Sequence, residues 1–143
     1  MARSKFWTIG QIDATGVKGP HEKEFEDISN ANYSLFTDID TIKLKKIITE
    51  DIGGKIENIG FGEDWTITLE IFPEVIINLA YSYFGDEFGD GITAEFKCFF
   101  SGERVTLVPG EDRIIYIDII FNFMERMIKI KNPLKNLTIK KLN

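Results

Sequence analysis

The fold is decided by residues 92–131, which read ITAEFKCFFSGERVTLVPGEDRIIYIDIIFNFMERMIKIK. The first part alternates between two sets of side chains, as a strand does when one of its faces is buried. One set is Ile92, Ala94, Phe96, Cys98 and Phe100, and the other is Thr93, Glu95, Lys97 and Phe99. The stretch therefore begins with a strand over 92–100.

Residues 101–131 predict a tight turn, another strand and a long helix. Ser101-Gly102 tolerates the positive φ of a hairpin, and the alternation resumes at Val105 and Leu107. Pro109-Gly110 ends this strand because proline cannot donate to a ladder. Residues 112–131 are apolar almost all round, with one narrow polar stripe. We therefore expect the rest of the fold to cover most of this helix.

The rest of the chain predicts a second main helix and more strands. Over 38–52, apolar residues recur at helical spacing between possible N-caps and a Gly53-Gly54 stop. Strands are predicted over 6–12, 33–36, 56–61 and 65–72, and 22–28 fits a short helix or a surface loop. Residues 74–84 fit a helix or a strand, and their β-branched and aromatic content favours the strand.

These elements predict an α+β fold. We expect an antiparallel β-meander of four to five strands with two main helices, about 38–52 and 112–131, packed on one face. A chain of 143 residues fits one domain. We place that globular domain at 1–131, followed by a basic tail or edge segment at 132–143.

The charge of the chain is uneven. Residues 129–143 hold five of the 17 basic side chains and no acid, so 12 bases face all 23 acids in residues 1–128. A body this acidic repels nucleic-acid phosphate and anionic membranes. We expect no nucleic-acid or membrane partner, and the surplus acid suits a basic protein partner or simply solubility.

The residues that carry most catalytic chemistry are scarce. Cys98 and His21 are the single cysteine and histidine, so a zinc site of several such ligands is excluded. A Cys98–His21 nucleophilic pair competes with a core role for Cys98, which shares a strand face with Phe96 and Phe100. The acidic loop 85–91 competes as a calcium site with a solvated hairpin loop. We expect no cofactor and no metal.

The lone cysteine fits a reducing compartment, and no apolar run is long enough to span a bilayer. We therefore expect a cytoplasmic protein. Its oligomeric state is left open.

The candidate site is the outer face of the predicted sheet, the face away from the helices. Aromatic and acidic side chains would share this surface, as partner interfaces often show. The hypothesis names Thr68, Glu70, Phe72, Thr93, Glu95, Lys97 and Phe99. The competing interpretation is that residues 5–36 or the C-terminal tail cover this face.

Two classes of function follow. The first is a non-catalytic protein-binding module, a small acidic protein that docks a basic partner through the outer sheet face. The second is a small-molecule-binding protein or enzyme with a pocket between sheet and helices. Trp65, Tyr81, Tyr83 or Tyr116 would line that pocket. Because no motif selects catalytic residues, the first class is our expectation.

Overall fold

The computed structural model describes residues 6–13, 19–37, 39–85 and 89–131. Its centre is a five-stranded antiparallel sheet in the order β1-β5-β4-β3-β2. The strands are β1 (Trp7–Thr8), β2 (Lys55–Glu57), β3 (Trp65–Phe72), β4 (Val75–Tyr83) and β5 (Ala94–Ser101). Neighbours from β2 to β5 follow one another in sequence, which confirms the predicted α+β fold with an antiparallel meander.

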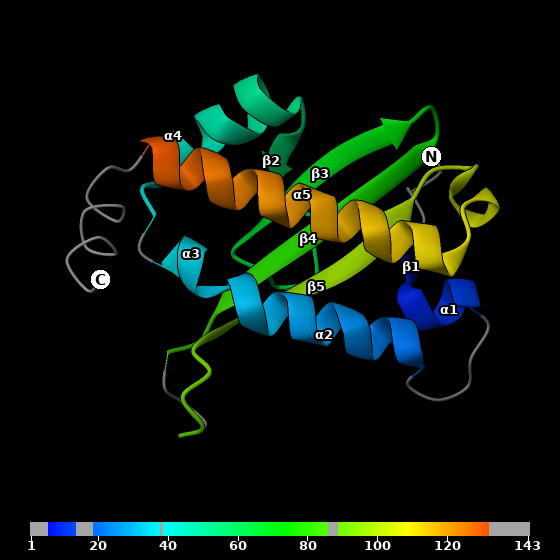
Figure 1. Cartoon of the computed structure of the whole chain (residues 1–143), viewed down its shortest axis with the longest axis horizontal. Coiled ribbons are helices and arrows are strands. Elements are labelled where there is room, and N and C mark those ends of the chain that lie inside the picture. Colours follow the sequence, from blue (N-terminus) through cyan, green and yellow to red (C-terminus); the bar gives the residue numbers. More distant parts are fainter. Residues whose placement is uncertain (1–5, 14–18, 38, 86–88, 132–143) are drawn as a thin grey trace.

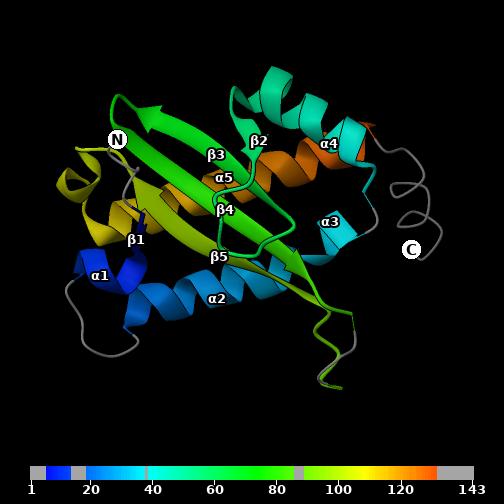
Figure 2. The same cartoon turned by 180° about the vertical axis from the view of Figure 1, so that it is seen from behind.

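The helices gather on one face of this sheet. They are α1 (Ile9–Asp13), α2 (Pro20–Asn32), α3 (Ser34–Thr37), α4 (Thr41–Lys46) with its π-helical continuation η1 (Ile47–Ile52), the 3₁₀ turn η2 (Val105–Leu107), and α5 (Gly110–Lys131). In Figure 1, α2 and α5 run side by side in front of the sheet. Figure 2 gives the opposite view, in which the strands lie in front of these helices. The predicted tail 132–143 lies outside the described residues.

The helix predicted over 38–52 forms as α4 and η1. The Asp40 side chain accepts a hydrogen bond from the Ile42 amide at 2.9 Å and so caps the N-terminus of α4. Gly53 ends the segment with φ of 82°, a left-handed conformation that glycine adopts without strain. Both ends therefore follow the signals in the sequence.

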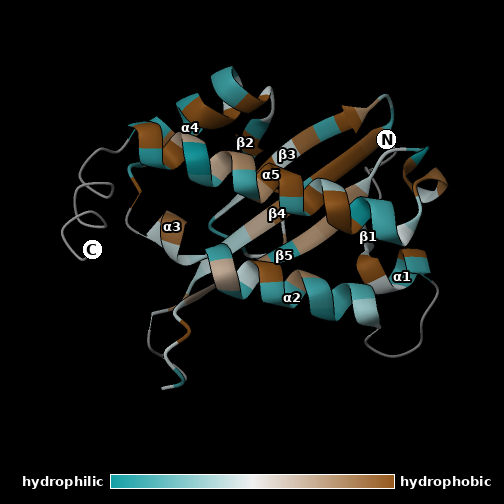
Figure 3. Ribbon diagram, in the orientation of Figure 1, coloured by the Kyte–Doolittle hydropathy of each residue, from teal (hydrophilic) through white to brown (hydrophobic). Residues whose placement is uncertain are grey.

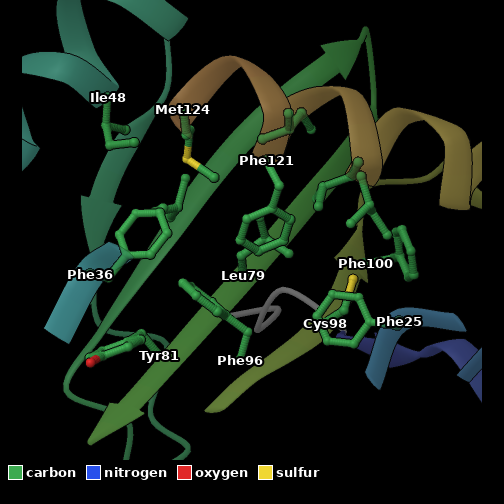
Figure 4. Close-up of a cluster of buried hydrophobic side chains, with 14 of the residues drawn as sticks. Phe25, Phe36, Ile48, Leu79, Tyr81, Phe96, Cys98, Phe100, Phe121 and Met124 are labelled. Atoms are coloured by element: carbon green, nitrogen blue, oxygen red, sulfur yellow. The ribbon is translucent and has the colours of Figure 1, made fainter. Parts of the chain in front are cut away.

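The core between sheet and helices is aromatic (Figure 4). The Phe96 ring of β5 lies 5.1 Å from Phe36 of α3 and 5.0 Å from Phe121 of α5, both in edge-to-face contact. Edge-to-face pairs add to the free energy that burial alone provides. Ile48 of η1 and Met124 of α5 close the same cluster and are fully buried. The sheet and the helices thus share one core.

Two predicted strands near the N-terminus are wrong. Residues 6–12 contribute only Trp7 and Thr8 to the sheet, because Thr8 and Gln11 exchange amide and side-chain hydrogen bonds in a capping box that starts α1. Within 33–36, Tyr33 is a turn whose amide donates to the Ser29 carbonyl of α2, and the residues after it belong to the helix α3. The segment 22–28 belongs to α2, which is longer than predicted.

Two further strands are shorter or absent. The strand predicted over 56–61 ends at Glu57, because the amides of Ile59 and Phe61 donate hydrogen bonds to the Glu63 carboxylate and not to a neighbouring strand. The strand predicted at Val105 and Leu107 is a 3₁₀ turn. Residues 74–84 form a strand, as their composition favours.

The predicted cover of the long helix is incomplete. The inner side of α5 is buried, with Ile117, Phe121 and Met124 fully inaccessible to solvent. Its outer side faces away from the sheet and leaves Ile115 and Ile119 more than half exposed. The apolar residues of 112–131 thus divide between the core and the surface of the molecule.

Candidate functional site

A groove runs along the edge of β5 beside α2. One edge of β5 pairs with β4. On the other edge β1 pairs only with Phe99 and Phe100, and among the described residues α2 contacts β5 as well. The Phe96 amide donates to Ser29 Oγ of α2 at 2.9 Å instead of to a strand. The β-ladder on this edge of β5 therefore stops before Phe99, and a depression lies between β5 and α2.

Two adjoining cavities make up this groove. One of about 340 Å³ lies between α2, the junction of β1 and α1 at Thr8 and Ile9, and residues 95–99 of β5. Another of about 520 Å³ lies beside it, toward Asp90 and Ile92. They share Glu26, Glu95 and Phe96, so the two form one continuous depression. Its length follows β5, which suits an extended segment of chain.

The lining of the groove is acidic over an apolar floor. Glu22, Glu26, Asp90 and Glu95 bring four carboxylates to it, and Lys97 is the one base among its described lining residues. Lys97 Nζ lies 3.9 Å from Glu95 Oε1, so its charge is already opposed within the groove. Buried Phe25 and Phe96 lie beneath. This surface can hold a basic segment that also carries apolar side chains.

Three of the predicted site residues, Glu95, Lys97 and Phe99, line this groove. The sequence hypothesis missed Glu22 and Glu26, which α2 brings to the same place. Their spacing of four residues puts both on one face of a helix, and that spacing was the available signal.

Two other predicted residues lie elsewhere on the outer face. Thr68 stands in a hydrogen-bonded chain, since Asn78 Nδ2 donates to its hydroxyl at 3.0 Å and the hydroxyl donates to the Glu57 carboxylate. Ser101 Oγ extends this chain by donating to Asn78 Oδ1 at 3.0 Å. Glu70 is exposed and lines a separate cavity of about 290 Å³ with Thr68. Polar side chains thus bridge four strands on this face.

The remaining two residues do not belong to the outer surface in the way the sequence suggested. The register of β3 against β4 shifts between Glu70 and Phe72, and Phe72 contacts Tyr116 of α5 with ring centroids 5.6 Å apart. A shift of one residue moves a side chain to the other face, so Phe72 sits on the helix side. Thr93 lies before β5, where its carbonyl accepts the amides of Phe84 and Gly85.

The cover of the outer face comes from an unexpected segment. Residues 58–64 cross this face between β2 and β3 (Figure 2), and the Phe61 ring stacks on Phe99 of β5 at 4.5 Å. Phe6 adds an edge contact to Phe61 at 5.7 Å, so the first described residues take part as well. The competing interpretation named residues 5–36 or the tail. Phe6 takes part in the cover, and the tail lies outside the described residues.

Glu63 anchors this crossing segment. Its carboxylate accepts the amides of Ile59 at 2.7 Å and Phe61 at 3.0 Å, and also the Thr66 hydroxyl. Burial acts to raise the pKa of Glu63, but these hydrogen bonds to the charged form outweigh it and hold the pKa below its usual value. The residue is a structural anion inside the loop.

His21 is held by a charged cluster at one end of the helices. Its Nδ1 lies 2.8 Å from Asp13 Oδ2, and Asp13 Oδ1 accepts from Arg113 Nη2 at 2.6 Å. The Arg113 guanidinium also donates to the Val108 carbonyl and lies 5.6 Å from the centre of the Phe100 ring. The cluster joins α1, α2 and α5, so it fixes how the helices sit on the sheet.

Cys98 is a core residue, as the strand pattern indicated. It is buried within the apolar cluster. Burial raises the pKa of its thiol far above the usual range, and the nearby Arg113 charge offsets only part of that effect. A thiol that stays protonated is a poor nucleophile, which argues against a Cys98–His21 pair.

The aromatic residues of the alternative pocket are engaged in packing. Trp65 and Tyr81 stack at 4.6 Å, and Tyr81 is buried. Tyr116 contacts Phe72, and Tyr83 is half exposed near the end of β4. These contacts give Trp65, Tyr81 and Tyr116 packing roles. Loop 85–91 includes residues 86–88, which lie outside the described residues.

Comparisons with protein-family models, with curated proteins and with solved structures found no match. Among the described residues, no group of three or more acidic, cysteine or histidine side chains is placed to hold a metal ion. The described helices include none with the length and apolar character needed to cross a membrane. The groove between α2 and β5 is the candidate functional site.

Proposed function

We propose that this chain is a non-catalytic protein-binding module that receives a basic segment of a partner protein in the groove between α2 and β5. The observation that carries the proposal is the convergence of acidic side chains from separate elements beside the edge of one strand. Glu22 and Glu26 come from α2 and Glu95 from β5, so the fold rather than a local charge run gathers them.

The chemistry of the groove supports a basic protein over other partners. Carboxylates at the rim pair with lysine and arginine side chains, while buried Phe25 and Phe96 offer contact to apolar ones. The formal net charge of −6 disfavours phosphate-rich partners such as nucleic acids.

The small-molecule alternative stays second. It required Trp65, Tyr81, Tyr83 or Tyr116 to line a pocket between sheet and helices, and the contacts of these residues favour a packing role. The groove along β5 is open and elongated and therefore suits a peptide segment better than a small molecule.

Photo-cross-linking from within the groove tests the proposal. A benzoylphenylalanine in place of Lys97, whose side chain is 65% exposed, is introduced in the source cell. The control carries the same group at Lys43, an exposed position on α4. We expect position 97 to capture a basic protein that position 43 does not. Identification by mass spectrometry reports the charge and sequence of that partner.

Charge reversal supplies the second arm of this test. Glu22→Lys combined with Glu95→Lys turns the rim basic, so we expect the cross-link to that partner to disappear. High salt should weaken capture by the wild-type charges, because screening reduces attraction between exposed groups. Equal capture by the reversed groove, or an acidic partner, would contradict the proposal.

A further inference from the structure

The outer face of α5 carries a stripe of exposed apolar side chains. Ile115, Ile119, Phe123 and Ile130 have relative exposures of 54%, 56%, 43% and 66%. Their spacing places them on one side of the helix, opposite the buried Ile117, Phe121 and Met124. Contiguous exposed apolar surface of this kind marks interaction sites on soluble proteins.

Helix α2 shows that this exposure is particular to α5. The two helices lie on the same face of the sheet (Figure 1), and both bury one side against it. The exposed positions of α2 include Lys23, Glu24, Asp27 and Asn30, all polar. Figure 3 shows the contrast as long teal stretches in α2 against brown turns in the middle of α5. Water therefore solvates the exposed side of α2 well, whereas the exposed side of α5 places apolar side chains in contact with water.

We propose that this face of α5 packs against the same face of a second copy of the chain, with the two helices antiparallel about a two-fold axis at Asn122. This homodimer goes beyond the binding of a partner in the β5 groove and uses a different surface. A two-fold axis makes the same patch meet itself, so one helix face has to complement its own reversed copy.

The charges on the exposed face of α5 meet that condition. Asp118 lies four residues before Asn122 and Arg126 four residues after it, and both are exposed. In an antiparallel pair centred at Asn122, each Asp118 faces the Arg126 of the other copy, which gives two ion pairs. Neither side chain has an ion pair with another described residue. A parallel pair would instead set like charges against each other.

The apolar residues follow the same symmetry. Ile115 lies seven residues before Asn122 and Ile130 eight residues after it. Ile115 of one copy therefore packs near Ile130 of the other copy. Ile119 and Phe123 fill the middle, where the two helices approach most closely. The dipoles of antiparallel helices also bring opposite ends together.

Asn122 itself fixes the register. On the axis, the amide of each Asn122 meets the amide of its copy, and two amides can donate to and accept from each other. An asparagine pair in the seam between two helices specifies register, because a slip separates the two amides. Asn122 is exposed at the border of the stripe, midway along its length, and this position fits a second copy better than an unrelated apolar ligand.

Sedimentation equilibrium of the full chain tests the dimer. Over loading concentrations from about 1 to about 200 µM, which covers interfaces of ordinary strength, we expect the mass to rise from 16.4 kDa toward twice that value. Ile119→Asp buries a charge in the seam and should keep the chain at the monomer mass. Because Ile119 is exposed in the monomer, the melting temperature of the Ile119→Asp variant in dilute solution should equal that of the wild type.

A charge swap tests the antiparallel arrangement. Asp118→Arg alone and Arg126→Asp alone each place like charges in contact, so each variant should remain a monomer. An equimolar mixture of the two should restore the dimer mass, because every contact then pairs opposite charges. Lys23→Glu on α2 serves as the control and should dimerise as the wild type does.

Three outcomes would overturn the proposal. The first is a wild-type chain at the monomer mass throughout this range, whatever other protein binds α5. The second is a dimer that Ile119→Asp leaves intact, which would place the contact on another face. The third is a mixture of the charge variants that stays monomeric while the wild type dimerises, which would exclude the antiparallel pairing.

Discussion

The two faces of the sheet are covered by different means. Helices cover one face and bury aromatic and aliphatic side chains such as Phe96 and Phe121. The crossing segment 58–64 covers part of the other, where Thr66, Asn78 and Ser101 are buried and hydrogen-bonded. Burial of apolar side chains stabilises the first face, and hydrogen bonds between buried polar side chains stabilise the second. The groove lies at the β5 edge, where the two kinds of surface meet.

This difference predicts unequal losses when a phenylalanine is removed from each face. Phe121→Ala leaves a cavity in the fully buried aromatic cluster and should cost about 3–5 kcal/mol of unfolding free energy. Phe61→Ala removes a ring that is 54% exposed on the other face, and should cost less than about 1 kcal/mol. Urea unfolding monitored by circular dichroism gives both values. Similar losses at the two positions would refute the contrast.

The next largest effect on the unfolding free energy is expected at Glu63, the carboxylate that anchors the crossing segment 58–64. Glu63→Gln sets an amide group against the donors that now bind the carboxylate and should cost about 1.5–3 kcal/mol at neutral pH. The exposed Glu103→Gln is the control and should change little. Thermal unfolding of both variants against the wild type measures the difference.

The same variant has a pH signature. The folded pKa of Glu63 is lowered, so its stabilising effect is present above the pKa of the unfolded carboxyl, about 4.3, and is lost as the pH falls through the folded value. The stability gap between wild type and Glu63→Gln should therefore narrow as the pH falls below about 4. A gap that is constant from neutral to acidic pH would show that the charge of Glu63 does not matter.

The polar chain across the strands should contribute less. Asn78→Ala removes the bonds to Thr68 and Ser101 and should cost about 1–2 kcal/mol. Ser82→Ala, on the same strand and face but half-buried, is the matched control. Chemical denaturation measures the unfolding free energy of both variants. If Asn78→Ala leaves that free energy unchanged, water replaces the hydrogen bonds of Asn78 at no cost.

The smallest expected effect is at the groove. Glu22→Lys with Glu95→Lys should alter the unfolding free energy by no more than about 0.5 kcal/mol, as is usual for surface substitutions. The pair thereby separates binding from folding, because capture from position 97 should be lost while stability is kept. A loss above about 1.5 kcal/mol in urea unfolding would instead assign these acids to the stability of the fold.

The elements that sequence reasoning identified are those whose periodic face is buried in the core. β3, β4, β5 and α5 have strong apolar periodicity, and η1 ends at the predicted glycine. The extent of α2 was missed because Ser29 and Asn32 are polar residues on its buried side. The Ser29 bond to Phe96 joins positions 67 residues apart, and no local pattern encodes such a contact.

The candidate site was predicted in part for the same reason. Alternation placed Glu95, Lys97 and Phe99 together because β5 is regular. It misplaced Phe72, since one register shift reverses the alternation, and it missed Glu22 because α2 could not be docked beside β5 from sequence alone. Local periodicity thus identified one wall of the groove, and tertiary packing added the other.

Hydrogen–deuterium exchange of the chain, alone and with the protein captured at position 97, is the most direct measurement of where a partner binds. The proposal predicts slower exchange in residues 94–98 and in α2 when the partner is added. Exchange in α4 and in residues 65–70 should stay the same. Protection confined to those control segments, or no protection anywhere, would contradict a binding site in the groove between α2 and β5.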